Sequence, residues 1–151
     1  ISLPPGRFGG PEIEALFTNT LDWDAHPYFT EIRGVQVSAH VLIRRDGSVV
    51  QFVPLNERAW HAGESCFRGR ERCNDFSIGI ELEGEDDSPY DQRQYAVLRN
   101  VIRAIVAAYP QISARELAAH SDIAPGRKTD PGPAFDWFRL YDGLAEGKGA
   151  T

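Results

Sequence analysis

Alternation of hydrophobic and polar residues along several short stretches of the chain predicts β-strands. Residues 35–43 and 48–53 are both rich in β-branched residues, and Arg45-Asp46-Gly47 lies between them. An Asp-Gly pair between two such runs is typical of a β-hairpin. In residues 76–83 every second residue is apolar, from Ile78 to Leu82. This period of two predicts a third strand with one hydrophobic face.

A period close to 3.6 residues predicts helices around these strands. Residues 91–109 carry apolar side chains at helical intervals, and Pro110 ends the pattern. Residues 11–17 are predicted as a shorter helix with a proline in its first turn, and residues 134–144 as the last helix. Strands interleaved with helices predict an α/β fold, with a mixed central β-sheet flanked by helices.

The composition fits one packed domain over residues 1–151, with a polar tail, residues 146–151, that we expect to be frayed. Hydrophobic residues make up 42% of the chain, and the formal net charge of −6 argues against nucleic acid as a partner. No apolar stretch approaches the roughly 20 residues that cross a bilayer, so no membrane partner is expected. Cys66 and Cys73 are expected to be reduced, although their spacing permits a small loop bridge.

A segment rich in proline and glycine, residues 118–133, contains side chains that suggest metal chemistry. Its composition argues against a regular helix. In an extended segment residues two apart point the same way, so Lys128 and Asp130 face one centre, and a returning loop brings His120 there. Histidine with a carboxylate is an ordinary zinc donor set. On this pattern alone, a solvated lysine and a turn-forming aspartate before proline explain the residues equally well.

Glu81, on the polar face of the third predicted strand, is a candidate general acid/base. A carboxylate beside an open metal site accepts a proton from water and passes it to a leaving amine. Gly79 lies on the same face and would leave space for a substrate. The alternative is that this face is simply the solvent-exposed side of a sheet, and the spacing does not choose between the two.

Three motifs, in order along the chain, resemble those of the AmpD family. They are Arg58-Ala59-Trp60-His61-Ala62-Gly63, the stretch from Gly69 to Gly84, and Arg127-Lys128-Thr129-Asp130-Pro131-Gly132-Pro133. The resemblance spans essentially the whole chain, from Ile1 to Trp137. Members of that family are anhydro-N-acetylmuramyl-L-alanine amidases of the amidase type 2 fold, related to phage endolysins and animal peptidoglycan-recognition proteins.

The resemblance implies a role for each polar residue singled out above. His120 and Asp130 would bind one Zn2+ per chain, Glu81 would be the general acid/base, and Lys128 would stabilise the oxyanion. Sites of this family use three protein ligands. The third is a histidine just before the Ile-Ser-Leu-Pro-Pro stretch, so it is expected upstream of Ile1, and the domain is expected to be N-terminally incomplete.

The histidine at position 40 is not expected to take the place of that third ligand. His40 matches a family position that is not assigned to zinc, and we expect it to be a hydrogen-bonded, partly buried side chain. His26, followed by proline, is expected in a loop or at a helix start.

Three residues are candidates for substrate binding. Arg72 lies in a loop with two other arginines, and a guanidinium fork suits the carboxylates of a stem peptide. The alternative is a solvated loop with Glu64 and Glu71 as partners. Trp60 and His61 would form a flat wall for sugar or peptide, whereas ordinary core packing is the alternative for Trp60.

The predicted function is zinc-dependent hydrolysis of the amide between N-acetylmuramic acid, in its 1,6-anhydro form, and L-alanine of muropeptides. The protein would be a cytoplasmic monomer of bacterial peptidoglycan recycling, because no signal peptide is visible at Ile1–Gly6 and the chain resembles AmpD itself. A periplasmic location stays open if an upstream segment carried a signal. Two other classes remain: a non-catalytic muropeptide-binding module with an incomplete zinc site, and a cysteine hydrolase using Cys66 or Cys73 with His61.

Overall fold

The predicted hairpin forms the centre of the protein, whose computed structural model describes residues 1–146. Strand β1 (Val41–Ile43) pairs antiparallel with β2 (Val49–Gln51), with Val41 opposite Gln51. In the turn, Asp46 accepts a hydrogen bond from the Ser48 amide at 2.8 Å. Residues 35–40 were predicted as strand but do not belong to it.

Strand β5 (Ile80–Leu82) completes a mixed sheet of order β2-β1-β5. It runs parallel to β1, with Leu42 opposite Glu81. The predicted strand over residues 76–83 is therefore correct in place and too long, because the chain joins the ladder only beyond Gly79. The carbonyl of Gly79 accepts from the amides of both His40 and Val41 at the point where the two strands meet.

The helices follow the predicted periodicity closely. Helix α3 (Gln92–Ala108) starts at Asp91, which forms a capping box with Gln94, and it ends before Pro110. Helix α1 (Glu12–Phe17) follows Pro11 as predicted. Helix α5 (Trp137–Glu146) begins three residues later than expected. Of the tail predicted to fray, Glu146 belongs to this helix and residues 147–151 lie outside the described residues.

Several short elements were not predicted. Helix α4 (His120–Ile123) corrects the expectation that residues 118–133 contain no regular helix; its four residues precede the first proline of the segment. At the start of α2 (Pro27–Glu31), His26 accepts from the Tyr28 amide at 3.1 Å, in agreement with a helix-start role. The remaining elements are the ladder of β3 (Cys66–Phe67) with β4 (Arg70–Glu71) and the 3-10 helices η1 (Cys73–Asp75) and η2 (Ala114–Glu116).

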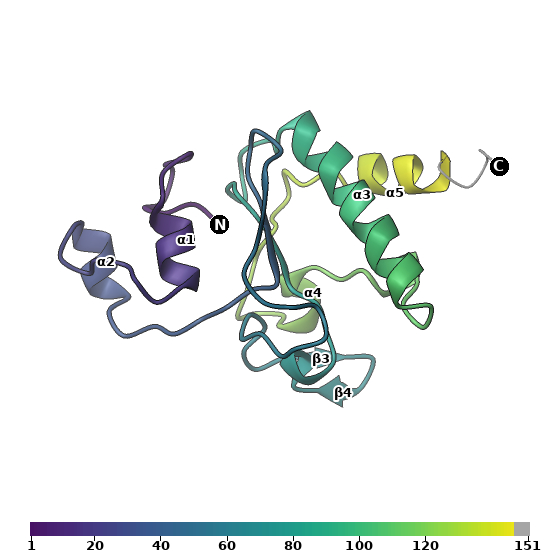
Figure 1. Cartoon of the computed structure of the whole chain (residues 1–151), viewed down its shortest axis with the longest axis horizontal. Helices are drawn as coiled ribbons and strands as arrows, with labels where there is room; N and C mark the ends of the chain where they lie inside the picture. The colour runs from purple at the N-terminus through teal and green to yellow at the C-terminus, as the bar shows by residue number, and fades with distance from the viewer. Residues whose placement is uncertain (147–151) are drawn as a thin grey trace.

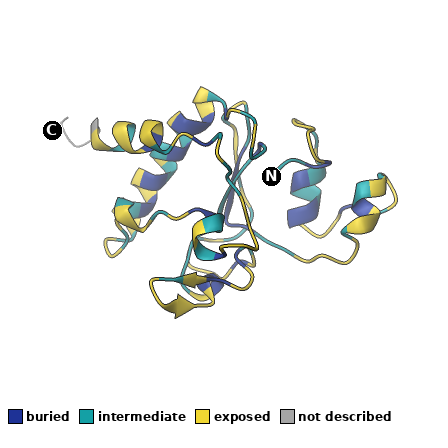
Figure 2. Cartoon of the chain, turned by 180° about the vertical axis from the view of Figure 1, so that it is seen from behind, coloured by how far each residue is buried: buried dark blue, intermediate teal, exposed yellow. Residues whose placement is uncertain are grey.

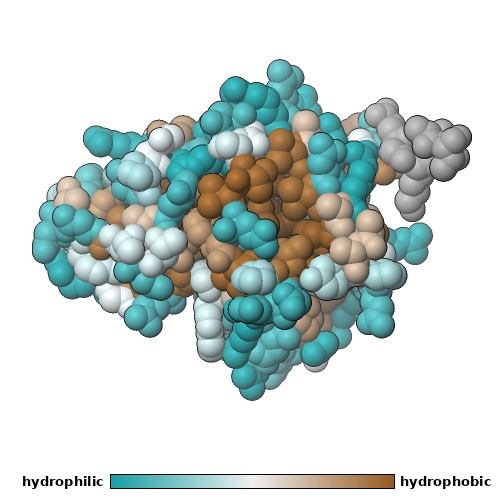
Figure 3. All heavy atoms as spheres, in the orientation of Figure 1, coloured by the Kyte–Doolittle hydropathy of each residue, from teal (hydrophilic) through white to brown (hydrophobic). Residues whose placement is uncertain are grey.

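The sheet lies between two groups of helices, α1 and α2 on one face and α3 and α5 on the other (Figure 1). Side chains of β1 point alternately into two cores, so that Leu42 packs against α1 while Val41 and Ile43 pack against α3. Figure 2 shows the buried residues on the inward sides of α1 and α3 and largely exposed residues on β3 and β4. In Figure 3 hydrophobic residues gather over the sheet, between α1 and α3.

This architecture is the predicted α/β domain with a mixed sheet flanked by helices. Within residues 1–146, no helix combines the length and apolarity that a membrane span requires. Both cysteines are free, Cys66 exposed and Cys73 buried, as expected for reduced thiols.

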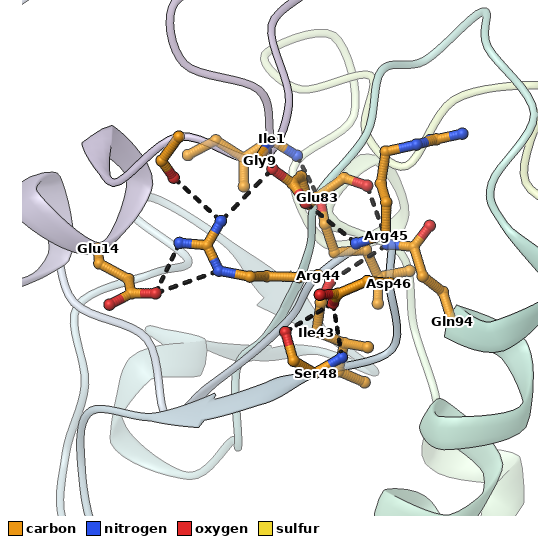
Figure 4. Close-up of polar contacts among 12 residues, drawn as sticks. Ile1, Gly9, Glu14, Ile43, Arg44, Arg45, Asp46, Ser48, Glu83 and Gln94 are labelled. Atoms are coloured by element: carbon orange, nitrogen blue, oxygen red, sulfur yellow. Dashed lines mark hydrogen bonds and ion pairs between the residues drawn. The ribbon is translucent and has the colours of Figure 1, made fainter.

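The polar face of β5 is covered rather than solvent-exposed, which corrects one of the two interpretations of that strand. Glu83 is only 2% exposed. Its carboxylate accepts from the amides of Gly9 at 2.5 Å and Arg45 at 3.0 Å, and the Arg44 guanidinium lies 3.6 Å away (Figure 4). Arg44 in turn donates to Glu14 on α1 at 2.6 Å. These contacts fasten the N-terminal segment and the hairpin to β5.

Candidate active site

His120 and Asp130 come together because the loop between them closes on itself. The amide of Ser121, in the first turn of α4, donates to the carbonyl of Asp130 at 3.1 Å. The side chains then face each other, with Nδ1 of His120 3.2 Å from Oδ2 of Asp130. Two ligands of one tetrahedral zinc ion, each about 2.0–2.2 Å from the metal, are separated by a similar distance.

The hydrogen bond made by the other nitrogen of His120 shows that this pair needs a proton or a metal ion between its two facing atoms. Nε2 of His120 lies 3.1 Å from the carbonyl oxygen of Ala62, which can only accept, so Nε2 carries a proton. In the neutral imidazole, Nδ1 then has a lone pair that points at the carboxylate of Asp130. Two acceptors at this distance need a proton or a metal ion between them. The donor chemistry therefore fits zinc, with the carbonyl orienting the ligand.

Without a metal ion, the proton takes that place. The hydrogen bond to Asp130 raises the pKa of His120 above its ordinary value. Burial alone would raise the pKa of Asp130, yet the hydrogen bond and charge of His120 bring it below the usual range. Both shifts favour a proton held between the two groups, and bound zinc would replace that proton.

Two ligands do not complete a catalytic zinc site. Among residues 1–146, no group of three His, Cys, Asp or Glu side chains is arranged to hold a metal ion. The third histidine, expected upstream of Ile1, stays a prediction. Ile1 itself lies beside β5: its amino group donates to the Leu82 carbonyl at 2.8 Å, and its carbonyl accepts from the Gly84 amide at 2.9 Å.

Glu81 lies half-buried on β5, close to this pair. Burial raises the pKa of the Glu81 carboxyl, and the charge of Asp130 raises it further. The exposed Lys128 lies near enough for its charge to lower the pKa values of Glu81, His120 and Asp130. The structure therefore brings together the four residues predicted to carry the chemistry.

The space above Gly79 is not open to a substrate, contrary to our expectation. A Cβ at this position would overlap the imidazole of His61, which covers the glycine. Burial, with the neighbouring His40 and His120, lowers the pKa of His61 to about 4. His61 is consequently a neutral side chain in the wall of the site.

Both ring nitrogens of His40 are hydrogen-bonded to the backbone. Nδ1 accepts from the Gly79 amide at 3.0 Å, and Nε2 lies 2.8 Å from the Glu57 carbonyl. The side chain is fully buried, more so than expected. Its hydrogen bonds leave no lone pair for a metal ion, in agreement with the expectation that His40 is not a ligand.

The loop containing the substrate-binding candidates is exposed. Trp60 is 56% exposed, which rules out core packing, and the Arg58 guanidinium lies 3.8 Å from its ring centroid. Asp75 pairs with both Arg58, at 2.9 Å, and Arg72, at 3.2 Å. The expectation that Glu64 and Glu71 are the partners of the arginine loop is therefore wrong for Arg72.

The other arginines of that loop are also engaged away from Glu64 and Glu71. Arg68 pairs with Glu116 at 3.8 Å, and Arg70 stacks on the ring of Phe76. Arg72 has a left-handed backbone, with φ of 60°, and its side chain stays 72% exposed. Arg72 therefore stays accessible to an anionic ligand although it pairs with Asp75.

The geometry gives no support to a thiol nucleophile. Cys73 is 1% exposed, and within residues 1–146 no hydrogen bond joins His61 to either cysteine. The nearest polar side-chain contact of His61 is Ser77, at 3.5 Å.

The sequence did not reveal the groups that support the site. The buried side chain of Asn74 accepts from the amides of His61 and Ala62, at 3.0 and 2.8 Å. Arg127 donates to the Ala62 carbonyl, and Thr129 hydrogen-bonds Asp86. An asparagine near two cysteines and an arginine after Pro-Gly are ordinary sequence patterns, so no local signal pointed to these roles.

Comparison with known proteins gives a consistent result. Residues 13–133 match the family model described as N-acetylmuramoyl-L-alanine amidase. The chain is 64% identical over 140 residues to 1,6-anhydro-N-acetylmuramyl-L-alanine amidase AmpD of Escherichia coli K12, covering 93% of this chain and 76% of that protein.

Solved structures agree with the sequence matches. The crystal structure of a selenomethionine AmpD derivative superimposes with a TM-score of 0.91 at 60% identity, covering 94% of this chain and 79% of the other. The amidase AmiD from E. coli, in complex with the substrate anhydro-N-acetylmuramic acid-L-Ala-D-gamma-Glu-L-Lys, gives a TM-score of 0.65 at 39% identity. This match covers 75% of this chain and 50% of the AmiD chain.

Proposed function

Because the chain belongs to the N-acetylmuramoyl-L-alanine amidase family, we propose that it cleaves the amide between 1,6-anhydro-N-acetylmuramic acid and L-alanine of muropeptides, with one zinc ion. The substrate class comes from the similarity to AmpD and to AmiD, whose complex holds an anhydromuramyl peptide. Removal of peptides from such fragments is a step of peptidoglycan recycling, for which we propose the cytoplasm as the compartment.

The observation that carries the zinc proposal is the geometry of His120 and Asp130. Their Nδ1 and Oδ2 atoms are 3.2 Å apart, and the Ala62 carbonyl sets the tautomer in which Nδ1 is free to bind a metal. We propose these two atoms as ligands, with the third donor from a histidine immediately preceding Ile1. When bound, zinc would polarise the amide carbonyl and lower the pKa of water at the site.

Glu81 and Lys128 would carry out the remaining chemistry. The raised pKa of Glu81 suits a group that takes a proton from the attacking water and returns it to the amine of L-alanine as the amide breaks. Lys128 would place its positive charge where the oxyanion develops, because its field already reaches Glu81, His120 and Asp130.

Recognition of the substrate would use the exposed loop beside this centre. We propose Trp60 and His61 as a wall against which sugar or peptide packs, and Arg72 as the partner of a stem-peptide carboxylate. Accordingly, Arg72→Ala should raise KM for substrates with an intact stem peptide, and an equal rise for bare muramyl-alanine would contradict that role.

Zinc content and turnover of the full-length protein test the proposal together. We expect one zinc per chain in the wild type by elemental analysis, and release of peptide from anhydro-muropeptides. Asp130→Ala should remove most of the metal and the activity. Full metal occupancy in this variant would overturn the ligand assignment. Binding of muropeptides without product by a wild-type protein that retains zinc would instead identify a non-catalytic binding module.

A further inference from the structure

The carbonyl oxygen of Ala62 is shared by two side chains from the segment that follows α3. It accepts from Nε2 of His120 at 3.1 Å and from Nη2 of Arg127 at 2.5 Å. A carbonyl oxygen has two lone pairs, so this acceptor is fully used. One of its donors is a proposed metal ligand, and the other is a guanidinium with no part in the chemistry described above.

Arg127 makes more than this single contact with the loop. Its Nη2 and Nε also donate to the carbonyl of Glu64, at 2.7 and 3.2 Å. The guanidinium lies flat against Gly63, where an added Cβ would stand 3.1–3.3 Å from three of its atoms. The absence of a side chain at Gly63 therefore lets the fork reach the carbonyls on both sides of it.

Arg127 bonds the two carbonyls that flank Gly63, whereas the Gly63 carbonyl itself accepts from the Ser65 hydroxyl at 3.0 Å. Ala62 is buried and its amide is held by Asn74, whereas Gly63 and Glu64 are exposed, and Gly63 has a φ of +61°. A left-handed glycine permits the loop to adopt several conformations. The two side chains bonded to the Ala62 carbonyl, His120 and Arg127, belong to one short segment of the chain. Arg127 therefore ties the loop to the same segment that contains His120.

We propose that Arg127 is a positioning residue, which holds the Ala62 carbonyl in place so that His120 keeps its Nε2 proton and directs Nδ1 at Asp130. The inference rests on the proposed function only for its consequence in zinc binding. Groups that orient metal ligands typically contribute about 10–100-fold to metal affinity or activity. A lysine at position 127 keeps the positive charge but is one atom shorter and lacks the Nε donor that reaches the Glu64 carbonyl, so it should restore part of the effect.

The direct test is the tautomer of His120 in the metal-free protein, read from imidazole ¹⁵N shifts at alkaline pH. We expect wild-type His120 to be held as the Nε2–H form, Arg127→Ala to give a mixture of tautomers, and Arg127→Lys to lie between them. Zinc affinity, measured by competition with a chelator, should fall about 10–100-fold in Arg127→Ala and less in Arg127→Lys.

Arg99→Ala is the matched control, because Arg99 is partly exposed and donates to a backbone carbonyl, that of Arg139 at 3.2 Å, away from the site. It should leave both the tautomer and the zinc affinity unchanged. If Arg127→Ala behaves like this control, the proposal is overturned. If Arg127→Ala does not fold, an Arg127→Lys variant that folds with wild-type tautomer and affinity overturns it equally. If the wild type binds no zinc, the proposed function fails, while the tautomer measurement still decides the role of Arg127.

Discussion

Glu81 and Glu83 lie two residues apart on the same face of β5, and their surroundings are opposite. Glu83 is nearly inaccessible and receives two backbone amides and the charge of Arg44. Glu81 is half-buried, and within residues 1–146 no hydrogen bond to its carboxylate is found; burial and the carboxylate of Asp130 raise its pKa. The first carboxylate is bound in place, and the second is left free to exchange a proton.

The difference arises from what covers each residue. The N-terminal segment and the hairpin turn fold over Glu83 and bring Gly9 and Arg45 to it from 74 and 38 residues away (Figure 4). Glu81 instead faces the loop of His120 and Asp130, whose charges affect its pKa. A fully hydrogen-bonded carboxylate stabilises a fold, whereas one that lacks hydrogen bonds and is partly desolvated is suited to acid–base chemistry.

The sharpest test of this contrast is the same isosteric change at both positions. Glu81→Gln should lower kcat about 10²–10⁴-fold, the usual contribution of a general acid/base, with zinc content unchanged. Glu83→Gln should keep most of the wild-type kcat. Steady-state hydrolysis of an anhydro-muropeptide by the two variants measures the difference. Equal losses of kcat would show that the two glutamates do not divide their roles in this way.

The second prediction concerns stability. Glu83→Ala should reduce the free energy of unfolding by about 2–6 kcal/mol, because it leaves the amides of Gly9 and Arg45 without their acceptor and takes one of two carboxylates away from Arg44. Glu81→Ala should cost much less. Urea denaturation followed by circular dichroism provides both values. In the Glu83→Ala/Arg44→Met double variant we expect a loss smaller than the sum of the single losses, and strict additivity would show that the two side chains are not coupled.

The third and smallest effect is the pH dependence of that stability. Burial holds the folded pKa of Glu81 above its ordinary value, so the folded state binds the extra proton between the unfolded and folded pKa values. The stability that the Glu81 carboxyl contributes is fully present below its unfolded pKa and is lost as pH rises through its folded pKa. Glu81→Gln, which cannot ionise, should therefore match the metal-free wild type in stability at a pH below the ordinary pKa of a glutamate, and become the more stable of the two as pH rises through the folded pKa. A stability difference that does not change with pH would contradict a raised pKa.

Parts of the fold and of the site were predictable because their signals are local. The Asp46-Gly47 turn, the capping of α3 by Asp91 and the interruption at Pro110 each depend on a few neighbouring residues. His120 and Asp130 are only ten residues apart, so a single closed loop brings them together. Predicted strands were too long because β-branched residues continue past the point where a partner strand is available.

The sequence by itself determined the α/β order of elements, the hydrophobic face of β5 and the side chains available for chemistry. Only the tertiary structure decided that Glu83 is buried while Glu81 is half-buried, that His61 fills the space above Gly79, and that Trp60 is exposed. Burial and hydrogen bonding at these positions depend on segments far away in the chain. Residue type and spacing limit which contacts a side chain can make, and the packing of distant segments selects among them.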